Sequence, residues 1–210
     1  GLLGPVSFLS MAEEIGMISE ITDQVMEQAL TWLSDWLPLV PYDFRVSVNV
    51  SPQELADPDL PERVLRALQT YGIAPRRLCI EVTEGGLIGN PQKAYRTMSD
   101  LSDLGVSIAV DDFGVGYSSL AYLNSYPVDV LTVDRSIVSA IGTNDRADAL
   151  VKGIVELGDA LGMTTMAEGV ETEAQLDCLR ETAANGYQGF LRSKPIPAEA
   201  LTAFMRDRLR

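Results

Sequence analysis

The chain contains no histidine, and this absence excludes several kinds of site at once. Ser-His-Asp triads, Cys-His nucleophiles and histidine-ligated metal centres all require an imidazole. Catalysis would therefore rely on carboxylates, amides and cations. Lysine is also scarce: Lys93 and Lys152 fall on predicted helices, Lys194 follows the last predicted strand, and there are no others. This placement disfavours a Schiff-base aldolase.

Cysteines and long apolar runs are few as well. Cys79 and Cys178 have neither metal-ligand spacing nor the pattern of a disulfide framework, so we expect both to be buried, reduced thiols. No stretch approaches the roughly 18 uninterrupted apolar residues of a membrane helix, and the opening residues lack the features of a signal peptide. The sequence therefore predicts a cytoplasmic protein with no direct membrane insertion.

Positive charge is in deficit too, because the formal net charge is −14. Such a protein repels long polyanions, so we expect no binding of DNA or RNA. A small phosphate ligand would need a metal ion or local arginines. With 210 residues, 46% of them hydrophobic, the chain matches a single domain over 1–210.

After an opening helix, strands and helices alternate along the chain. In that opening segment a stripe of apolar residues follows a helical period: Ile18, Ile21, Val25, Leu30, Leu33 and Leu37. The predicted strands are 44–50, 78–82, 106–110, 128–133, 164–167 and a short one around Tyr187. The predicted helices are 59–71, 92–104, 118–123, 145–161, 173–180 and a last one from Ala198. This alternation predicts an α/β protein with a parallel sheet.

A polar residue closes nearly every predicted strand. These residues are Asn49, Glu81, Asp111 with Asp112, Asp134, Glu168 and Gln188. One such residue alone is usually a helix cap or turn former, but six strand ends together are typical of the active-site rim of a TIM barrel. Their oxygen atoms suit Mg²⁺, Mn²⁺ or Ca²⁺, and the adjacent aspartates could face two metal ions beside a phosphodiester.

Ordered motifs give the chain a specific resemblance. Six motifs resemble the EAL-domain family in order and spacing. They are VNVS at 48–51, IEVTE at 80–84, DDFGVGYSSLAYL from Asp111, VDVLTVDRS at 128–136, AEGVET at 167–172 and QGF at 188–190. The resemblance covers essentially all 210 residues. It implies a TIM-like (β/α) barrel that cleaves the bacterial second messenger cyclic di-GMP to pGpG with Mg or Mn, in signal transduction.

The resemblance also implies roles for individual residues. Asn49, Glu81, Asp111, Asp112 and Glu168 match metal ligands, and Glu168, Asp112 and Gln188 match catalytic groups. Gln188, Ser51 and Asp134 match ligand-binding positions. Glu84 matches the anchor of the DDFG loop and Glu171 a supporting carboxylate, although either could simply cap a helix. The resemblance further implies a homodimer through 113–123.

Two departures from the family pattern leave the activity open. About six strand-helix units are present where a closed barrel has eight, and the strand carrying the Glu-Ala-Leu signature is expected upstream of Gly1. Thr132 stands where the family usually has a lysine. The chain is therefore either a phosphodiesterase or a catalytically inactive EAL domain that senses cyclic di-GMP or binds a protein. An unrelated magnesium-dependent barrel phosphohydrolase would require the motif order to be coincidence.

Overall fold

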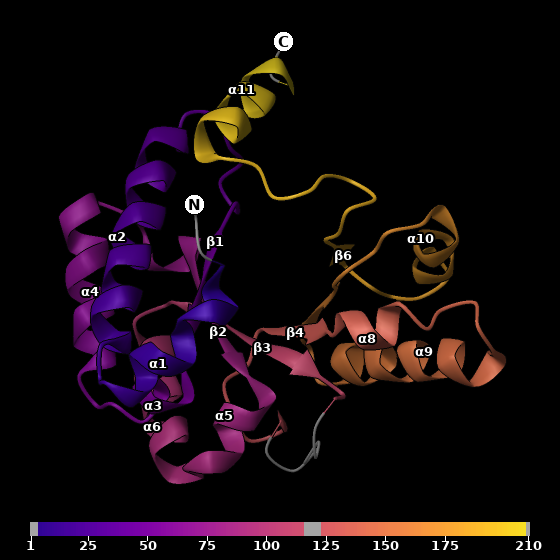
Figure 1. Ribbon diagram of the computed structural model, residues 1–210, viewed down its shortest axis with the longest axis horizontal. Coiled ribbons are helices and arrows are strands. Elements are labelled where there is room, and N and C mark those ends of the chain that lie inside the picture. Colours follow the sequence, from indigo (N-terminus) through magenta and orange to yellow (C-terminus); the bar gives the residue numbers. More distant parts are fainter. Residues whose placement is uncertain (1–3, 116–122, 209–210) are drawn as a thin grey trace.

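A six-stranded parallel sheet forms the centre of the molecule, with each strand paired to the next one along the chain (Figure 1). The structure, a computed structural model, describes residues 4–115 and 123–208. The strands are β1 (Val46–Val50), β2 (Leu78–Thr83), β3 (Ser107–Phe113), β4 (Val130–Val133), β5 (Thr164–Ala167) and β6 (Gly186–Tyr187). The predicted α/β class and the TIM-like order of strands and helices are confirmed.

Helices precede, connect and follow the strands. They are α1 (Leu9–Glu14), α2 (Ile18–Trp36), α3 (Pro52–Leu55), α4 (Leu60–Tyr71), α5 (Glu84–Gly89), α6 (Pro91–Asp103), α8 (Arg135–Val138), α9 (Asp145–Ala160), α10 (Glu173–Arg180) and α11 (Ala198–Arg208), with 3₁₀ turns at Pro5–Ser7 and Pro75–Arg77. Because every strand pairing is parallel, the carboxyl ends of all six strands lie on one edge of the sheet.

Helix α4 shows why the local sequence folds as it does. Leu60, Val64 and Leu68 recur every four residues and are fully buried, so they form one apolar face against the core. Pro61 occupies the first turn, where its missing N–H is tolerated, and Gly72 ends the helix in the left-handed conformation. The start, the buried face and the end of the helix are therefore all determined by its own twelve residues and by the glycine that follows them.

Helix α2 buries the predicted residues Ile18, Leu30 and Leu33, but the stripe between them differs from the prediction. Val25 is 47% exposed, whereas Thr22 and Met26 are buried in the stripe that continues through Leu30 and Leu33. The apolar pattern was misleading because the small polar side chain of Thr22 is hydrogen-bonded in the interior. The indole N–H of Trp36, at the end of this helix, donates to Thr202 Oγ1 at 2.8 Å, which joins α2 to α11.

Some predicted boundaries also require correction. The third strand continues past Val110 to Phe113, so both aspartates lie within it rather than beyond it. The first and fourth strands begin at Val46 and Val130, each two residues later than expected. The helix predicted at 118–123 lies almost entirely outside the described residues.

The two cysteines differ in environment. Cys79 is buried in β2, and burial raises the pKa of its thiol to about 12, so it stays protonated at neutral pH. Cys178, expected to be buried, is only partly so on α10; both are free. Within the described ranges, none of the helices combines the length and apolar character needed to cross a bilayer.

Candidate functional site

The polar residues predicted to close the strands do lie along one edge of the sheet. Asn49 is in β1, Glu81 in β2, and Asp111 and Asp112 in β3. Asp134 directly follows β4, Glu168 follows β5, and Gln188 follows β6. Parallel pairing therefore brings side chains from six strands to a common rim.

A local irregularity places two consecutive carboxylates at this rim. Successive side chains of a regular strand point to opposite faces. The pairing between β3 and β4 shifts register between Val110 and Phe113, and Asp112 has a φ of 57°. This left-handed conformation is uncommon for a residue other than glycine. The backbone N–H of Asp112 donates to Asp111 Oδ1 at 2.9 Å.

Asn49 and Glu81 face each other across β1 and β2. They are register partners, and Asn49 Nδ2 donates to Glu81 Oε2 at 3.3 Å. Burial raises the pKa of Glu81; a hydrogen bond from Ser47 lowers it, and the nearby carboxylate of Asp111 raises it further. Glu81 therefore interacts with both neighbouring strands: it accepts a hydrogen bond from Asn49 in β1 and is repelled by the carboxylate of Asp111 in β3.

Glu168 has the most perturbed carboxyl group of the rim. Burial, followed by repulsion from Asp111, Glu81, Asp112 and Asp134, raises its pKa to about 7. Four acidic side chains from the ends of three strands, β2, β3 and β4, thus act on a single carboxyl group. Such mutual repulsion is relieved either by a proton or by a cation.

Gln188 joins Glu168 through a short hydrogen bond in which Gln188 Nε2 donates to Glu168 Oε1. The backbone holds this pair together, because the N–H of Val170 donates to the Gln188 carbonyl at 3.1 Å. Gly189 makes this close approach possible: a Cβ built there would lie 2.1 Å from the Val170 carbonyl oxygen. Sequence reasoning missed this glycine, although its place after Gln188 in QGF was visible.

Asp134 both caps a helix and takes part in the rim. Its side chain accepts from the backbone N–H of Ser136 at 2.8 Å, which caps α8. Burial acts to raise the pKa of Asp134, but the hydrogen bonds from Ser136 and Arg135 lower it overall. A side-chain hydrogen bond joins Asp134 to Asp112, whose own pKa is raised by burial and by Asp111. The pKa of Asp134 is thus lowered while that of its neighbour Asp112 is raised.

Ser51, assigned to ligand binding by resemblance, has a structural partner in the same turn. Its hydroxyl accepts from the backbone N–H of Glu54 at 3.3 Å, and Glu54 Oε2 accepts from the Ser51 N–H at 3.4 Å. This is a capping box for α3. The signal was present in the sequence as SPQE at 51–54, with serine and glutamate three residues apart.

The two supporting carboxylates lie on opposite sides of the rim. Glu84 is buried at the start of α5, and its Oε2 accepts from the backbone N–H of Gly114 at 3.2 Å; its Oε1 has no hydrogen-bond partner within the described part of the chain. Glu171 is exposed and pairs with Arg135 Nη2 at 2.6 Å. Neither one is an N-cap, because Thr83 and Thr172 occupy those positions.

A pocket of ≈ 640 Å³ opens beside this rim. Gln188 and Glu171 line it on one side, and Phe190, Ile196 and Phe204 provide apolar surface. Two cations approach the Phe190 ring: the Arg135 guanidinium carbon lies 6.0 Å from its centroid and Lys194 Nζ lies 5.7 Å away. An aromatic ring flanked by cations suits a planar, anionic ligand.

The rim carries the donor atoms that a hard divalent cation prefers. Its amide and carboxylate oxygens are typical ligands of Mg²⁺ and Mn²⁺, and their repulsion favours a cation. Within 4–115 and 123–208, however, no three acidic side chains are gathered closely enough to enclose an ion as they lie. The site therefore fits a metal by chemistry and by mutual repulsion, with its side chains spread around the rim.

Comparison with known proteins identifies the family. The model of the "EAL domain" family matches residues 1–195. The chain belongs to the EAL-domain family. The cyclic di-GMP phosphodiesterase NbdA of Pseudomonas aeruginosa is 41% identical to this EAL domain over 207 residues, which cover 98% of this chain and 26% of NbdA.

A second relative from Pseudomonas aeruginosa links sequence and structure. The bifunctional diguanylate cyclase/cyclic di-GMP phosphodiesterase MucR is 38% identical over 203 residues, 97% of this chain and 30% of MucR. A solved structure of the PaMucR phosphodiesterase in complex with c-di-GMP superimposes with a TM-score of 0.91 and 38% identity, covering 96% of this chain and 81% of that one. This EAL domain therefore spans about a quarter to a third of the length of these two curated relatives.

Proposed function

We propose that this EAL domain binds cyclic di-GMP at the carboxyl edge of its sheet, together with Mg²⁺ or Mn²⁺. The main support is the convergence of acidic side chains from three strands on Glu168, at the end of a fourth; together with burial they raise its pKa to about 7. In the proposed site, Asn49, Glu81, Asp111, Asp112 and Glu168 hold metal. A bound metal ion would supply positive charge to a phosphodiester and activate water for its displacement.

The other residues of the proposed site orient the metal ligands, hold the DDFG loop or contact the ligand. Gln188 donates to Glu168 and so orients one carboxylate oxygen, while the oxygen of its side-chain amide can accept from water or ligand. In the metal-free site Asp134, with its lowered pKa, accepts a hydrogen bond from Asp112, whose pKa is raised. Glu84 holds the backbone at Gly114, where the DDFG loop begins. Phe190, Arg135 and Lys194 offer a surface for a guanine base and its phosphate.

Thr132 decides how fast the bound ligand would be cleaved. It is buried in β4, two residues before Asp134, so the two side chains leave the same face of the strand. A lysine at 132 would extend toward the rim and offset charge in the transition state, which is worth roughly 2–4 kcal/mol for one such group. We therefore propose binding with slow turnover.

Chromatography of cyclic di-GMP incubated with Mn²⁺ and protein tests this proposal. The unsubstituted protein should bind the ligand and release little pGpG, whereas Thr132→Lys should raise the rate roughly 100-fold with little change in affinity. Thr132→Met, similar in length but neutral, is the matched control and should not raise it. Brisk conversion by the unsubstituted protein would contradict the proposed role of Thr132, and absence of ligand binding would refute the proposal as a whole.

The second candidate function is that of an inactive EAL domain, which senses cyclic di-GMP or binds a protein, and Thr132 is the observation that favours it. Ligand binding with no turnover even in Thr132→Lys would establish the sensor. The proposal also includes a homodimer through 113–123, a segment that lies mostly outside the described residues. Sedimentation at increasing protein concentration tests this, and a monomer throughout would remove it.

A further inference from the structure

A fully buried carboxylate lies in α3, the short helix that directly follows β1. Glu54 in α3 is only 1% exposed. Its Oε2 accepts hydrogen bonds from Thr22 Oγ1 at 2.8 Å, from the Ser51 hydroxyl at 3.3 Å and from the Ser51 backbone N–H at 3.4 Å. Its Oε1 accepts from Arg63 Nη2 at 3.0 Å. A buried charge with this many donors has a strongly determined position.

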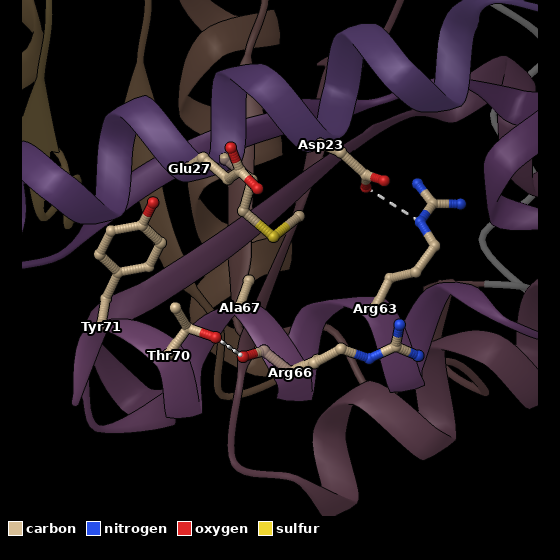
Figure 2. Close-up of a pocket in the computed structure, with 8 residues that line it drawn as sticks. Asp23, Glu27, Arg63, Arg66, Ala67, Thr70 and Tyr71 are labelled. Carbon is tan, nitrogen blue, oxygen red and sulfur yellow. Dashed lines mark hydrogen bonds and ion pairs between the residues drawn. The ribbon is translucent and has the colours of Figure 1, made fainter.

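Arg63 connects this carboxylate to two helices. In Figure 2, Arg63 extends from α4 toward Asp23 on α2, beside a pocket of ≈ 180 Å³ between the two helices. Its Nε donates to Asp23 Oδ1 at 3.0 Å and its Nη1 to Asp57 Oδ2 at 3.1 Å. One guanidinium thus fixes α2, α4 and the loop after α3 relative to Glu54, through its rigid fork of donors.

The network is directly continuous with the first strand end. Ser51, which is hydrogen-bonded to Glu54 through both its N–H and its hydroxyl, lies two residues after Asn49. Val48 and Val50 are buried on the other face of β1, so the strand is held on that side by the core. Asn49 in turn donates to Glu81. The position of the Asn49 amide therefore depends on where Glu54 holds the turn.

We infer that Glu54 is a positioning residue: with Arg63 and Thr22 it fixes the turn after β1 so that the Asn49 side chain is presented to the divalent cation. This inference rests on the proposed function, because it assumes a cation at the rim. Glu54 itself touches neither metal nor ligand, and it acts through Ser51 and the backbone of β1. Groups that orient metal ligands in this indirect way commonly change metal affinity by about tenfold or more when they are replaced.

Titration of the protein with Mn²⁺, followed by the electron paramagnetic resonance signal of free Mn²⁺, tests the inference. Glu54→Gln keeps the shape but places an amide among four donors, and it should weaken Mn²⁺ binding about tenfold. Thr22→Val removes a single donor to Glu54 with little change of shape, so it should fold readily and weaken binding by about two- to threefold. Glu62→Gln, which changes an exposed partner of Arg66 on α4 outside this network, should leave Mn²⁺ affinity unchanged.

A double-mutant cycle with Asn49→Ala separates positioning from general destabilisation. If Glu54 acts through Asn49, Glu54→Gln should have almost no further effect on Mn²⁺ affinity in the Asn49→Ala background. Leu68→Ala, a truncation buried in α4, should lower the melting temperature without changing Mn²⁺ affinity.

Three results would overturn the inference. Mn²⁺ affinity could be unchanged in both Glu54→Gln and Thr22→Val, which would leave Glu54 a structural residue only. The loss could instead be the same with and without Asn49, which would place its action elsewhere. Finally, failure of the unsubstituted protein to bind Mn²⁺ would refute the proposed function itself, so the two failures are distinguishable.

Discussion

The two ends of the rim are built in different ways. At the β1 end, Asn49 is backed by a buried charged network centred on Glu54, which joins three helices. At the β5–β6 end, Glu168 and Gln188 are held by backbone hydrogen bonds between two loops, and the nearby pair of Arg135 and Glu171 is exposed. One end is fixed by buried charge and the other by the close approach of backbones. We therefore expect substitutions at the β1 end to act through the loss of buried charge pairing, and substitutions at the β5–β6 end to act through steric collision between backbones.

Gly189→Ala should have the largest effect, and only at the β5–β6 end. The added Cβ would collide with the Val170 carbonyl, so the loops must separate and the free energy of unfolding should fall by roughly 1–3 kcal/mol. Gly153→Ala is the matched control, because a Cβ there meets nothing within 4 Å on α9. That variant should stabilise the protein by about 0.5–1 kcal/mol. Urea unfolding curves measure both, and equal stability of the two variants would contradict the close-approach argument.

The pH dependence of Mn²⁺ binding should be next in size. The pKa of Glu168 is raised from 4.5 to about 7, so this carboxyl group is protonated below that pH and must lose its proton to bind a cation. Mn²⁺ affinity should therefore fall about tenfold for each pH unit below 7. In metal-free protein the contribution of Glu168 to stability is fully present below about pH 4.5 and is lost as pH rises through 7, where the carboxylates repel one another.

Glu168→Gln separates this effect from general acid denaturation. The variant should bind Mn²⁺ more weakly, with a flatter pH dependence, and its metal-free form should not lose stability between pH 5 and 7. Isothermal titration and thermal melts at several pH values provide the comparison. An unchanged pH profile in Glu168→Gln would show that another carboxyl group governs the titration.

A pair of substitutions at Asp112 should have a smaller effect on stability. Asparagine tolerates the left-handed backbone that Asp112 adopts, whereas alanine does not, so Asp112→Ala should be about 1 kcal/mol less stable than Asp112→Asn. Both remove the charge and should weaken Mn²⁺ binding, Asp112→Ala more strongly because asparagine keeps an amide oxygen. Equal stability of the two variants in thermal melts would show that the backbone relaxes freely there.

Removing the exposed ion pair should have the smallest effect. Arg135→Ala should change the free energy of unfolding by about 0.5 kcal/mol or less, because Arg135 and Glu171 are both solvent-exposed. Arg180→Ala, which removes an exposed pair with Asp177 on α10, is the control. If Arg135 contacts bound cyclic di-GMP, fluorescence titration should show weaker ligand binding in Arg135→Ala alone. A loss in both variants would point to net charge instead.

Features determined by short-range sequence could be predicted, whereas features determined by tertiary contacts could not. The fifth strand and helix α10 have the bounds that the apolar pattern predicted, because short-range periodicity and caps determine them. Parallel pairing then makes the rim predictable from strand ends alone. Short helices such as α5 and α8 were missed, since one or two turns leave little periodic signal.

Features that depend on tertiary contact could not be predicted in the same way. The burial of Thr22 in place of Val25 depends on Glu54, which is 32 residues away in the chain. The left-handed Asp112 depends on how β3 meets β4, and consecutive aspartates alone do not specify it. A polarity pattern predicts that polar residues face solvent. A polar residue that is buried with a hydrogen-bonding partner breaks this rule, and its burial cannot be predicted until the partner is known.

The tight contact at Gly189 also bears on how members of such a family lose function during evolution. A protein could retain every carboxylate of the rim and still lose its assembly if this glycine acquired any side chain, since the obstacle is the backbone of Val170. A search that scores only charged signature residues would count such a member as intact. In this chain the glycine is present, so the close backbone approach between the loops of Glu168 and Gln188 is kept.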